Sequence, residues 1–516
     1  MHHRNIALRF SLLVFLASCG LHSPAQNKNT QQQPNIILFL VDDMGWMDTS
    51  VPFGGTSGKL NQQFRTPNMQ RMAQEGMLFT NAYANPVCTP TRASLLTGAS
   101  AARTHITNWT NISANQRVDF PDSVLQTPAW NLNGLSPVPF EGCFVAQPLP
   151  QLLKEAGYTT LHVGKAHWGG QGSPGSDPLN LGFTSNVGGS ASGHPQSYYG
   201  VKNFGNERNR ITQWAVPGLQ EFYGQDIFLT EALTRKAVQL METPIEQERP
   251  FFLYLGHYAV HTPIQADSRF VNRYLQAGMD STEAAYASLI EGMDKSLGDI
   301  MDFLKAKNTD KNTILIFMSD NGGLSNAGRG GKRNTHNAPL RAGKGSMYEG
   351  GIRIPMMVKW PGVTKPGSRA HQYVMVEDFF STVLDITGIE RKASTAIDGK
   401  SYLSILKNPA LSDTTRALVF HYPHRWTVQE DEAISWASAI RKGNWKLVYR
   451  MKQQKLELYN LLNDISETND LSKIYPLETI RLARLLGNEL RNRGAQMPTW
   501  KQTGKLVAWP DELSAP

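Results

Sequence analysis

Cysteine is scarce in this chain, and its scarcity excludes a disulfide-stabilised fold. The 516 residues contain three cysteines, Cys19, Cys88 and Cys143, too few for a framework of disulfide bonds. Long apolar runs are absent too, since the run at residues 11–17 is too short to span a bilayer. The sequence has no basic run with interleaved aromatic residues, which argues against nucleic acid as a partner.

The composition is that of an ordinary globular protein. Hydrophobic residues make up 40% and charged residues 18% of the chain, and a chain of this length can bury a large core and form more than one domain. The formal charge is +8, and without Arg4 and Arg9 in the leader it is +6. This modest excess suits polyanionic substrates.

The amino terminus predicts an export signal. Two arginines precede a short apolar stretch, and the Leu-Ala-Ser-Cys sequence that ends at Cys19 resembles a bacterial lipobox. We therefore predict a signal peptide at residues 1–18, a lipid anchor on Cys19 as the only contact with a membrane, and a polar tether at residues 19–33. The protein would be a periplasmic or outer-membrane lipoprotein. The alternative is an ordinary secretory signal and a secreted protein.

Two apolar runs rich in β-branched residues predict strands that are buried on both faces. Residues 35–41 are followed by two aspartates, and residues 313–318 are followed, one residue later, by aspartate and asparagine. Open α/β sheets bind ligands at the carboxyl ends of their strands. Oxygen ligands of this kind select Ca²⁺ or Mg²⁺ over Zn²⁺, although acidic turn residues are also common. The side chains concerned are those of Asp42, Asp43, Asp320 and Asn321.

Helix and strand patterns alternate up to about residue 415. A helix is predicted from Pro67 to a stop at Gly76, a strand at 251–255 and a long amphipathic helix at 286–304. This alternation predicts an α/β sandwich with a large, mainly parallel sheet flanked by helices, over residues 34–415. We interpret residues 107–148 as an inserted surface loop that shapes a cleft.

The pattern changes in the last hundred residues. A strand at 438–449, a partner strand at 456–461 and a closing helix at 480–490 predict a smaller α+β domain over residues 416–516.

Residues 88–98 carry the most specific motif. Their sequence, Cys-Thr-Pro-Thr-Arg-Ala-Ser-Leu-Leu-Thr-Gly, resembles the signature of type I sulfatases, including bacterial carbohydrate sulfatases and arylsulfatase A. The resemblance implies an alkaline-phosphatase-like fold and oxidation of Cys88 to formylglycine by a formylglycine-generating or anaerobic sulfatase-maturing enzyme. It also implies that Arg92 holds the aldehyde hydrate. The alternative is that Cys88 is a buried thiol with a structural role only.

Further motifs of the same family follow in order along the chain. Residues 157–168 resemble its second signature, which implies that Lys165 neutralises sulfate charge and that His167 takes a proton from the hydrate. We expect these two side chains to point to the same side of an extended segment. Residues 251–263 end in His-Thr-Pro, which implies that His261 protonates the departing alcohol. Residues 339–355 resemble the family's lysine loop, which implies that the ammonium group of Lys344, like that of Lys165, contacts the sulfate.

The resemblance also implies a metal site. Four positions match the family's ligands for a divalent cation, Ca²⁺ or alternatively Mg²⁺, together with residue 88 itself. These ligands are Asp42, Asp43, Cys88, Asp320 and Asn321. Arg92→Ala or Lys344→Ala is expected to abolish activity without unfolding the protein.

The implied function is hydrolysis of a sulfate monoester. Residues 186–199 and 421–424 look like segments of bacterial carbohydrate sulfatases, some of which act on 4-O-sulfated galactose or N-acetylgalactosamine. We therefore expect a sulfated glycan as substrate. His194, His421 and His424 are candidates for sugar contacts and equally for structural roles.

Three alternatives differ in chemistry. An arylsulfatase would act broadly on small sulfate esters. A phosphodiesterase of the alkaline-phosphatase group would share the fold, but it would have serine or threonine in place of Cys88 and usually two metals. A glycan-binding lipoprotein without catalysis would be expected to have lost part of the signature or a lysine, and neither has been lost.

Overall fold

The structure is a computed structural model that describes Met1 and residues 33–207, 210–211, 213–324, 337–390, 396–426 and 434–513. Apart from Met1, the predicted signal peptide lies outside the described residues, as do Cys19, the predicted site of lipid attachment, and the predicted tether up to residue 32. Within the described residues, no helix has the length and apolar character needed to cross a membrane.

A mixed sheet of eight strands forms the centre of the molecule, in the order β13-β2-β12-β11-β1-β10-β6-β7. Only β12 runs against its neighbours; the other strands are parallel to one another. The bounds are β1 Asn35–Val41, β2 Met77–Tyr83, β6 Thr159–Gly164, β7 Ser185–Val187, β10 Phe251–Gly256, β11 Thr313–Ser319, β12 Arg353–Lys359 and β13 Ser368–Met375.

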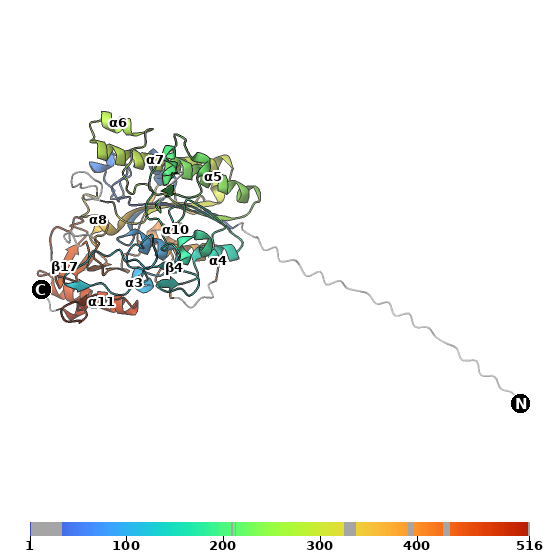
Figure 1. The fold of residues 1–516 in the computed structure, drawn as a ribbon. Helices are drawn as coiled ribbons and strands as arrows, with labels where there is room; N and C mark the ends of the chain where they lie inside the picture. The colour runs from blue at the N-terminus through green and yellow to red at the C-terminus, as the bar shows by residue number, and fades with distance from the viewer. Residues whose placement is uncertain are drawn as a thin grey trace.

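Both faces of this sheet are covered by helices, which explains why its central strands β1, β10 and β11 are fully buried and mainly apolar. Alternate residues of β1 enter two different cores: Phe39 packs on one side and Leu38 on the other. Figure 1 shows α5, α6 and α7 on one side of the sheet and α4 on the opposite side. The first layer contains α1 Pro67–Glu75, α5 Leu229–Glu246, α6 Val271–Gln276 and α7 Ser281–Ala306; the second contains α2 Cys88–Thr97, α4 Leu149–Glu155, α9 Asp378–Thr387 and α10 Leu403–Lys407.

A second, antiparallel sheet lies near the carboxyl terminus, in the order β14-β15-β16-β17 (Figure 1). One of its faces packs against the first part of the chain through Tyr83 and Phe420, and the other packs under α11 through Leu447 and Leu486. Its elements are β14 Ala417–Tyr422, β15 Ala437–Lys442, β16 Trp445–Arg450, β17 Lys455–Asn460 and α11 Pro476–Asn492.

The predicted fold class, an α/β sandwich with a smaller carboxyl-terminal α+β unit, is confirmed. The predicted single strand at 438–449 is wrong, because a tight turn at Gly443 and Asn444 divides it into β15 and β16. Gly443 has a φ of 60°, which favours glycine, and a Gly-Asn pair between strand-forming runs is itself a hairpin signal. The domain boundary at residues 415 and 416 stays a prediction, since the two sheets share a core.

Residues 107–148 are folded more tightly than a surface loop. Asn108, Leu135 and Ser136 are fully buried. Short strands within this stretch pair with each other or with the carboxyl terminus, so the insertion forms part of the body of the protein.

The remaining short elements are α3 Ala101–Thr104, α8 Glu349–Ile352, β3 Leu125–Gln126, β4 Gly134–Ser136, β5 Cys143–Val145, β8 Asn206–Glu207, β9 Arg210–Ile211 and β18 Thr499–Trp500.

Candidate active site

The acidic residues that follow β1 and β11 lie together. These strands are neighbours, with Val41 opposite Ser319, so the residues after them leave the same edge of the sheet. The backbone N–H of Asp43 donates to Oδ1 of Asp320 at 3.1 Å, and Nδ2 of Asn321 donates to Oδ1 of Asp43 at 2.8 Å. The four oxygen-bearing side chains expected from the sequence therefore form one cluster.

Helix α2 brings Cys88 and Arg92 to this cluster. Cys88 is its first residue, and Arg92 lies one turn further along, on the same face of the helix. The guanidinium is fully buried; its Nε donates to Oδ2 of Asp320 at 2.9 Å and its Nη1 to the carbonyl of Lys165 at 2.9 Å. Arg92 thus holds three segments of the chain together.

Lys165 and His167 also reach the cluster, but not from an extended segment as expected. Strand β6 ends at Gly164, and His167 has a left-handed φ of 56°, so the alternation rule for strands does not apply. The ammonium of Lys165 lies 2.7 Å from Oδ2 of Asp42. Nδ1 of His167 lies 3.4 Å from Sγ of Cys88. A turn, not a strand, directs both side chains to one place.

His261 and Lys344 complete the group from two further loops. His261 follows β10, and its Nε2 lies 3.6 Å from Oδ2 of Asp43. The ammonium of Lys344 lies 2.6 Å from Oδ1 of the same aspartate. The six side chains proposed for catalysis thus lie together at the acidic cluster, although they come from four separate stretches of sequence.

The cluster contains equal numbers of buried acidic and basic groups. Asp42, Asp43 and Asp320 pair most closely with Lys165, Lys344 and Arg92 respectively, and Arg92 also lies 3.9 Å from Oδ1 of Asp42. Burial raises the pKa of Asp42 well above its usual range, and the charge of Asp320 adds to this effect. Burial also raises the pKa of Asp43, but Lys344 and His261 outweigh it and hold that pKa well below its usual range.

The donor atoms fit a divalent metal ion. Oδ1 of Asp42, Oδ2 of Asp43 and Oδ1 of Asn321 are buried and accept no hydrogen bond from any described residue. A buried oxygen without a donor is costly, and a hard cation satisfies several at once. The ligand atoms of Asp42, Asp43 and His261 lie within 4.8 Å of one another. Asp320 differs, because both of its oxygens already accept hydrogen bonds.

A pocket of about 230 Å³ opens beside this cluster. Cys88, His167, His261 and Lys344 line it, so the reactive side chains are accessible to a ligand from one cavity. Burial lowers the pKa of His261 well below its ordinary value, with Asp43 opposing and Lys344 supporting the shift. The other lining residues are Trp109, Thr110, Ile112, Gly193, His194, Trp214 and Trp426.

Of the three histidines considered for sugar contacts, only His194 lines this pocket. His421 is buried, with its ring nitrogens bonded to Oγ of Ser438 and to the carbonyl of Gln496. His424 is also buried, and both of its nitrogens are bonded within the protein. His421 and His424 therefore have structural roles.

The three pocket tryptophans were missed in the sequence. Trp109, Trp214 and Trp426 lie in separate loops, and no spacing connects them. Their common location depends on tertiary packing. A cluster of tryptophans in the two segments that resemble carbohydrate sulfatases would have been a signal, but neither segment contains one.

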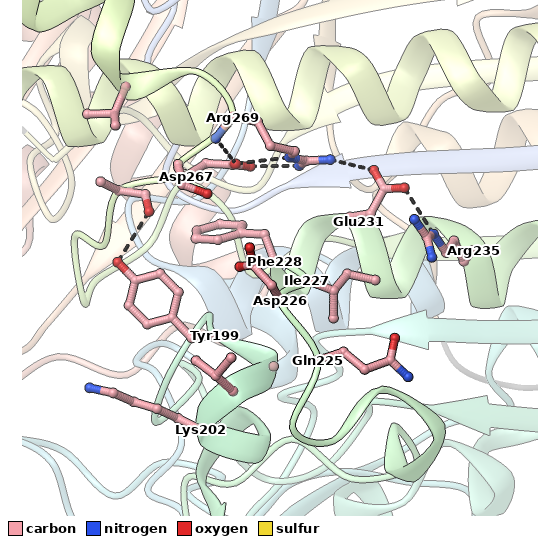
Figure 2. Close-up of a pocket in the computed structure, with 15 residues that line it drawn as sticks. Tyr199, Lys202, Gln225, Asp226, Ile227, Phe228, Glu231, Arg235, Asp267 and Arg269 are labelled. Carbon is pink, nitrogen blue, oxygen red and sulfur yellow. Dashed lines mark hydrogen bonds and ion pairs between the residues drawn. The ribbon is translucent and has the colours of Figure 1, made fainter.

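A larger cavity, of about 610 Å³, lies between α5 and the loops around Tyr199 and Asp267 (Figure 2). Its charged side chains bind one another: Arg269 contacts Asp267 and Glu231, each at 2.6 Å, and Arg235 donates to Glu231 at 3.0 Å. None of the residues proposed for catalysis lines this cavity. Four of the six proposed side chains, those of Cys88, His167, His261 and Lys344, line the smaller pocket instead.

Comparison with known proteins agrees with this geometry. The Sulfatase family model matches residues 34–389, and a model described as N-sulphoglucosamine sulphohydrolase, C-terminal, matches residues 342–493. The first match covers more than half of the sequence, and the chain therefore belongs to the sulfatase family. It is an enzyme that hydrolyses sulfate esters, as the resemblance implied.

Individual relatives are similar over most of their length. A sulfatase of Formosa agariphila is 30% identical over 97% of both chains, and the N-acetylgalactosamine-6-sulfatase of Mus musculus is 32% identical over 80% of this chain and 72% of its own. The crystal structure of Ps i-CgsB superimposes with a TM-score of 0.69 at 28% identity, over 90% of this chain and 94% of that one. The same protein has been solved in complex with k-i-k-neocarrahexaose.

Proposed function

We propose that this sulfatase removes O-sulfate from a carbohydrate, with Cys88 and the five side chains around it, Arg92, Lys165, His167, His261 and Lys344, as its catalytic group. The observation that carries the proposal is the convergence of Lys165, Lys344 and Arg92 on a buried acidic cluster beside Cys88. Sulfate monoesters are anions, and a nucleophile approaches them only where cations offset their charge.

In this proposal the overall reaction adds water to the ester and releases an alcohol and sulfate, and the bond that breaks joins sulfur to the alcohol oxygen. Lys165 and Lys344 offset charge on the outer sulfate oxygens, and His261 donates a proton to the departing alcohol oxygen. His167 is 3.4 Å from Sγ of Cys88 and accepts a proton from the group at that position. The anionic sulfate favours the protonated form of His261 when it binds.

Two further components belong to the proposal. Formylglycine, made from Cys88, would supply a hydrated aldehyde with a nucleophilic hydroxyl. Calcium, or alternatively magnesium, would hold sulfate oxygens as a Lewis acid, with Asp42, Asp43 and Asn321 as ligands that offer unpaired buried oxygens. Asp320 would join these ligands with oxygens that also accept hydrogen bonds from Arg92 and from the backbone of Asp43. Arg92 orients the start of α2 relative to this site.

We propose galactose or N-acetylgalactosamine as the sulfated sugar. The mouse relative is named for 6-sulfate on N-acetylgalactosamine, and Ps i-CgsB binds a neocarrahexaose. The segments at 186–199 and 421–424 favoured 4-sulfate on the same sugars. The two sulfate positions are therefore the first to be compared in an assay.

The test is sulfate release from a panel of sulfated saccharides. The protein is co-produced with a maturation enzyme, and mass spectrometry measures the conversion of Cys88. We expect release from a 4- or 6-sulfated galacto-sugar by the converted protein and none by Cys88→Ala. If the converted protein releases no sulfate from any saccharide but cleaves an aryl sulfate, the carbohydrate assignment is wrong. If unconverted protein is fully active, the role of formylglycine is wrong.

We also propose that the protein is exported and anchored through lipid on Cys19, in the periplasm or at the outer membrane. The support is the lipobox-like sequence that ends at Cys19. Cells fed with a labelled fatty acid should label the wild-type protein but not Cys19→Ala. An unlabelled, fully secreted wild-type protein would favour the ordinary secretory signal.

A further inference from the structure

Three tryptophans form much of the wall of the catalytic pocket. Trp109, Trp214 and Trp426 are all half-buried, and each comes from a different part of the chain. Large aromatic side chains left partly open to solvent beside a reactive site are typical of ligand contacts. The catalytic chemistry described above uses none of the three.

Trp214 is connected to the catalytic group through His194. The two rings are stacked, with centroids 4.3 Å apart and planes at 15°. His194 in turn lies parallel to His261, at 5.9 Å and 7°. A sugar that rests on Trp214 would therefore lie at a fixed distance from the histidine proposed to protonate its oxygen.

The other two tryptophans are positioned by a buried chain of hydrogen bonds. Oγ1 of Thr107 and Nε2 of His424 are 2.6 Å apart, and Nδ1 of His424 is 2.6 Å from Oδ1 of Asp119. Thr107 comes two residues before Trp109, and His424 comes two residues before Trp426. These hydrogen bonds connect the segment that carries Trp109 to the segment that carries Trp426, although the two are more than three hundred residues apart in the sequence.

Trp426 also packs directly on the lysine loop. A Cβ atom at Gly345 would lie 2.2 Å from Cε3 of Trp426, so only glycine allows this approach. Gly345 follows Lys344, whose ammonium contacts the acidic cluster. One wall of the pocket is therefore continuous with a group proposed to bind sulfate.

We propose that Trp109, Trp214 and Trp426 bind the pyranose ring that carries the sulfate. The inference rests on the proposed carbohydrate sulfatase function and adds residues that determine specificity. The C–H faces of a pyranose are apolar and gain from burial against indole rings, while its sulfate is held by the charged group. A pocket of about 230 Å³ is smaller than the usual range for larger ligands, so it admits one ring with its sulfate.

The experiment compares converted wild-type protein with Trp109→Ala, Trp214→Ala and Trp426→Ala. The matched control is Trp445→Ala, which removes a half-buried tryptophan on β16, outside the pocket. Two quantities are measured for each protein: kcat and KM for the sulfated saccharide that the wild type cleaves best, and the inhibition constant of inorganic sulfate. Cys88 conversion and melting temperature are checked for every variant.

We expect KM for the saccharide to rise about tenfold or more in each pocket variant, because stacking against the ring is lost. The inhibition constant of inorganic sulfate should change by less than about threefold, because sulfate alone does not need the indoles. Trp445→Ala should leave both quantities as in the wild type.

If the wild type cleaves saccharides and the three variants keep its KM, the inference is wrong and the proposed function stands. A wild type that is converted but cleaves no saccharide overturns the proposed function itself. A parallel loss of saccharide and inorganic sulfate binding would also contradict the inference, because the variants would then have damaged the charged site. The conservative variant Trp214→Phe should recover part of the lost affinity.

Discussion

Glu377 gives a direct test of the electrostatics of this fold, because burial of its carboxyl outweighs the favourable charges of Arg493 and Arg416. The residue precedes α9, is 1% exposed, and its Oε2 accepts no hydrogen bond from the described residues. Burial raises the pKa of Glu377 from 4.5 to about 7, and the neighbouring charge of Asp378 adds to the shift. The folded protein therefore binds this proton more tightly than the unfolded chain does.

The sign of the effect follows from this difference. The contribution of Glu377 to stability is most favourable below pH 4.5, falls as the pH rises, and is constant above pH 7. With these two pKa values the loss between pH 5 and pH 8 is about 2.5 kcal/mol. Glu377→Gln keeps the shape of the side chain and removes its ionisation. The unfolding free energy of the variant, relative to that of the wild type, should therefore rise by about 2.5 kcal/mol from pH 5 to pH 8.

The assay is urea denaturation of both proteins at pH 5, 6, 7 and 8. The slope of the unfolding free energy against urea concentration is compared between the proteins. Glu155→Gln, an exposed glutamate at the end of α4, is the control and should follow the wild type. If the difference in unfolding free energy between Glu377→Gln and wild type is the same at pH 5 and pH 8, the carboxyl does not ionise in this interval and the reasoning is refuted.

Three further predictions follow from other buried groups. Arg92→Ala should lose activity and about 3–5 kcal/mol of unfolding free energy, measured in urea, because it leaves Asp320 buried and unpaired; unchanged stability would contradict this. Calcium should raise the melting temperature of the wild type and EDTA should lower it, and Asp42→Asn should abolish both shifts; equal shifts in the two proteins would exclude Asp42 as a ligand. Asp294→Ala should cost about 1–3 kcal/mol in denaturant, because it leaves two backbone N–H groups at the start of α1 without their acceptor; a change below about 0.5 kcal/mol would show that water replaces it.

The first of these predictions revises an expectation from the sequence. Charge and motif suggested that Arg92→Ala would remove activity and leave the fold intact. The structure shows a guanidinium that is fully buried and bonded both to Asp320 and to the backbone at Lys165. Burial cannot be read from a short motif, because it depends on the layers that cover α2 from outside.

Three strands of the central sheet, β1, β10 and β11, were predictable because they are buried runs of mainly apolar residues. The runs at 35–41 and 313–318 correspond to β1 and β11 within one residue. The same runs placed their aspartates at one sheet edge, because the carboxyl ends of neighbouring parallel strands coincide. The helix at 67–75 followed from proline at its start and glycine at its end.

Local sequence was less informative where chain reversals or distant contacts decide the structure. The β15–β16 hairpin depended on one Gly-Asn turn within a long strand-forming run. Residues 107–148, rich in asparagine, proline and serine, were predicted to be a surface loop, but contacts with α2, the second sheet and the carboxyl terminus bury much of the segment. Composition describes a segment alone and says little about its neighbours.

The sequence by itself determined the family, the buried central strands and the candidates for the catalytic group, because motifs and hydrophobic periodicity are local properties of the chain. Only the tertiary structure decided which side chains surround Cys88 at what distance, which oxygens lack partners, and which residues form the pocket wall. Trp109, Trp214 and Trp426 illustrate the difference, since no local pattern connects them. Their meeting depends on buried hydrogen bonds and packing between distant segments, which the order of residues along the chain does not display.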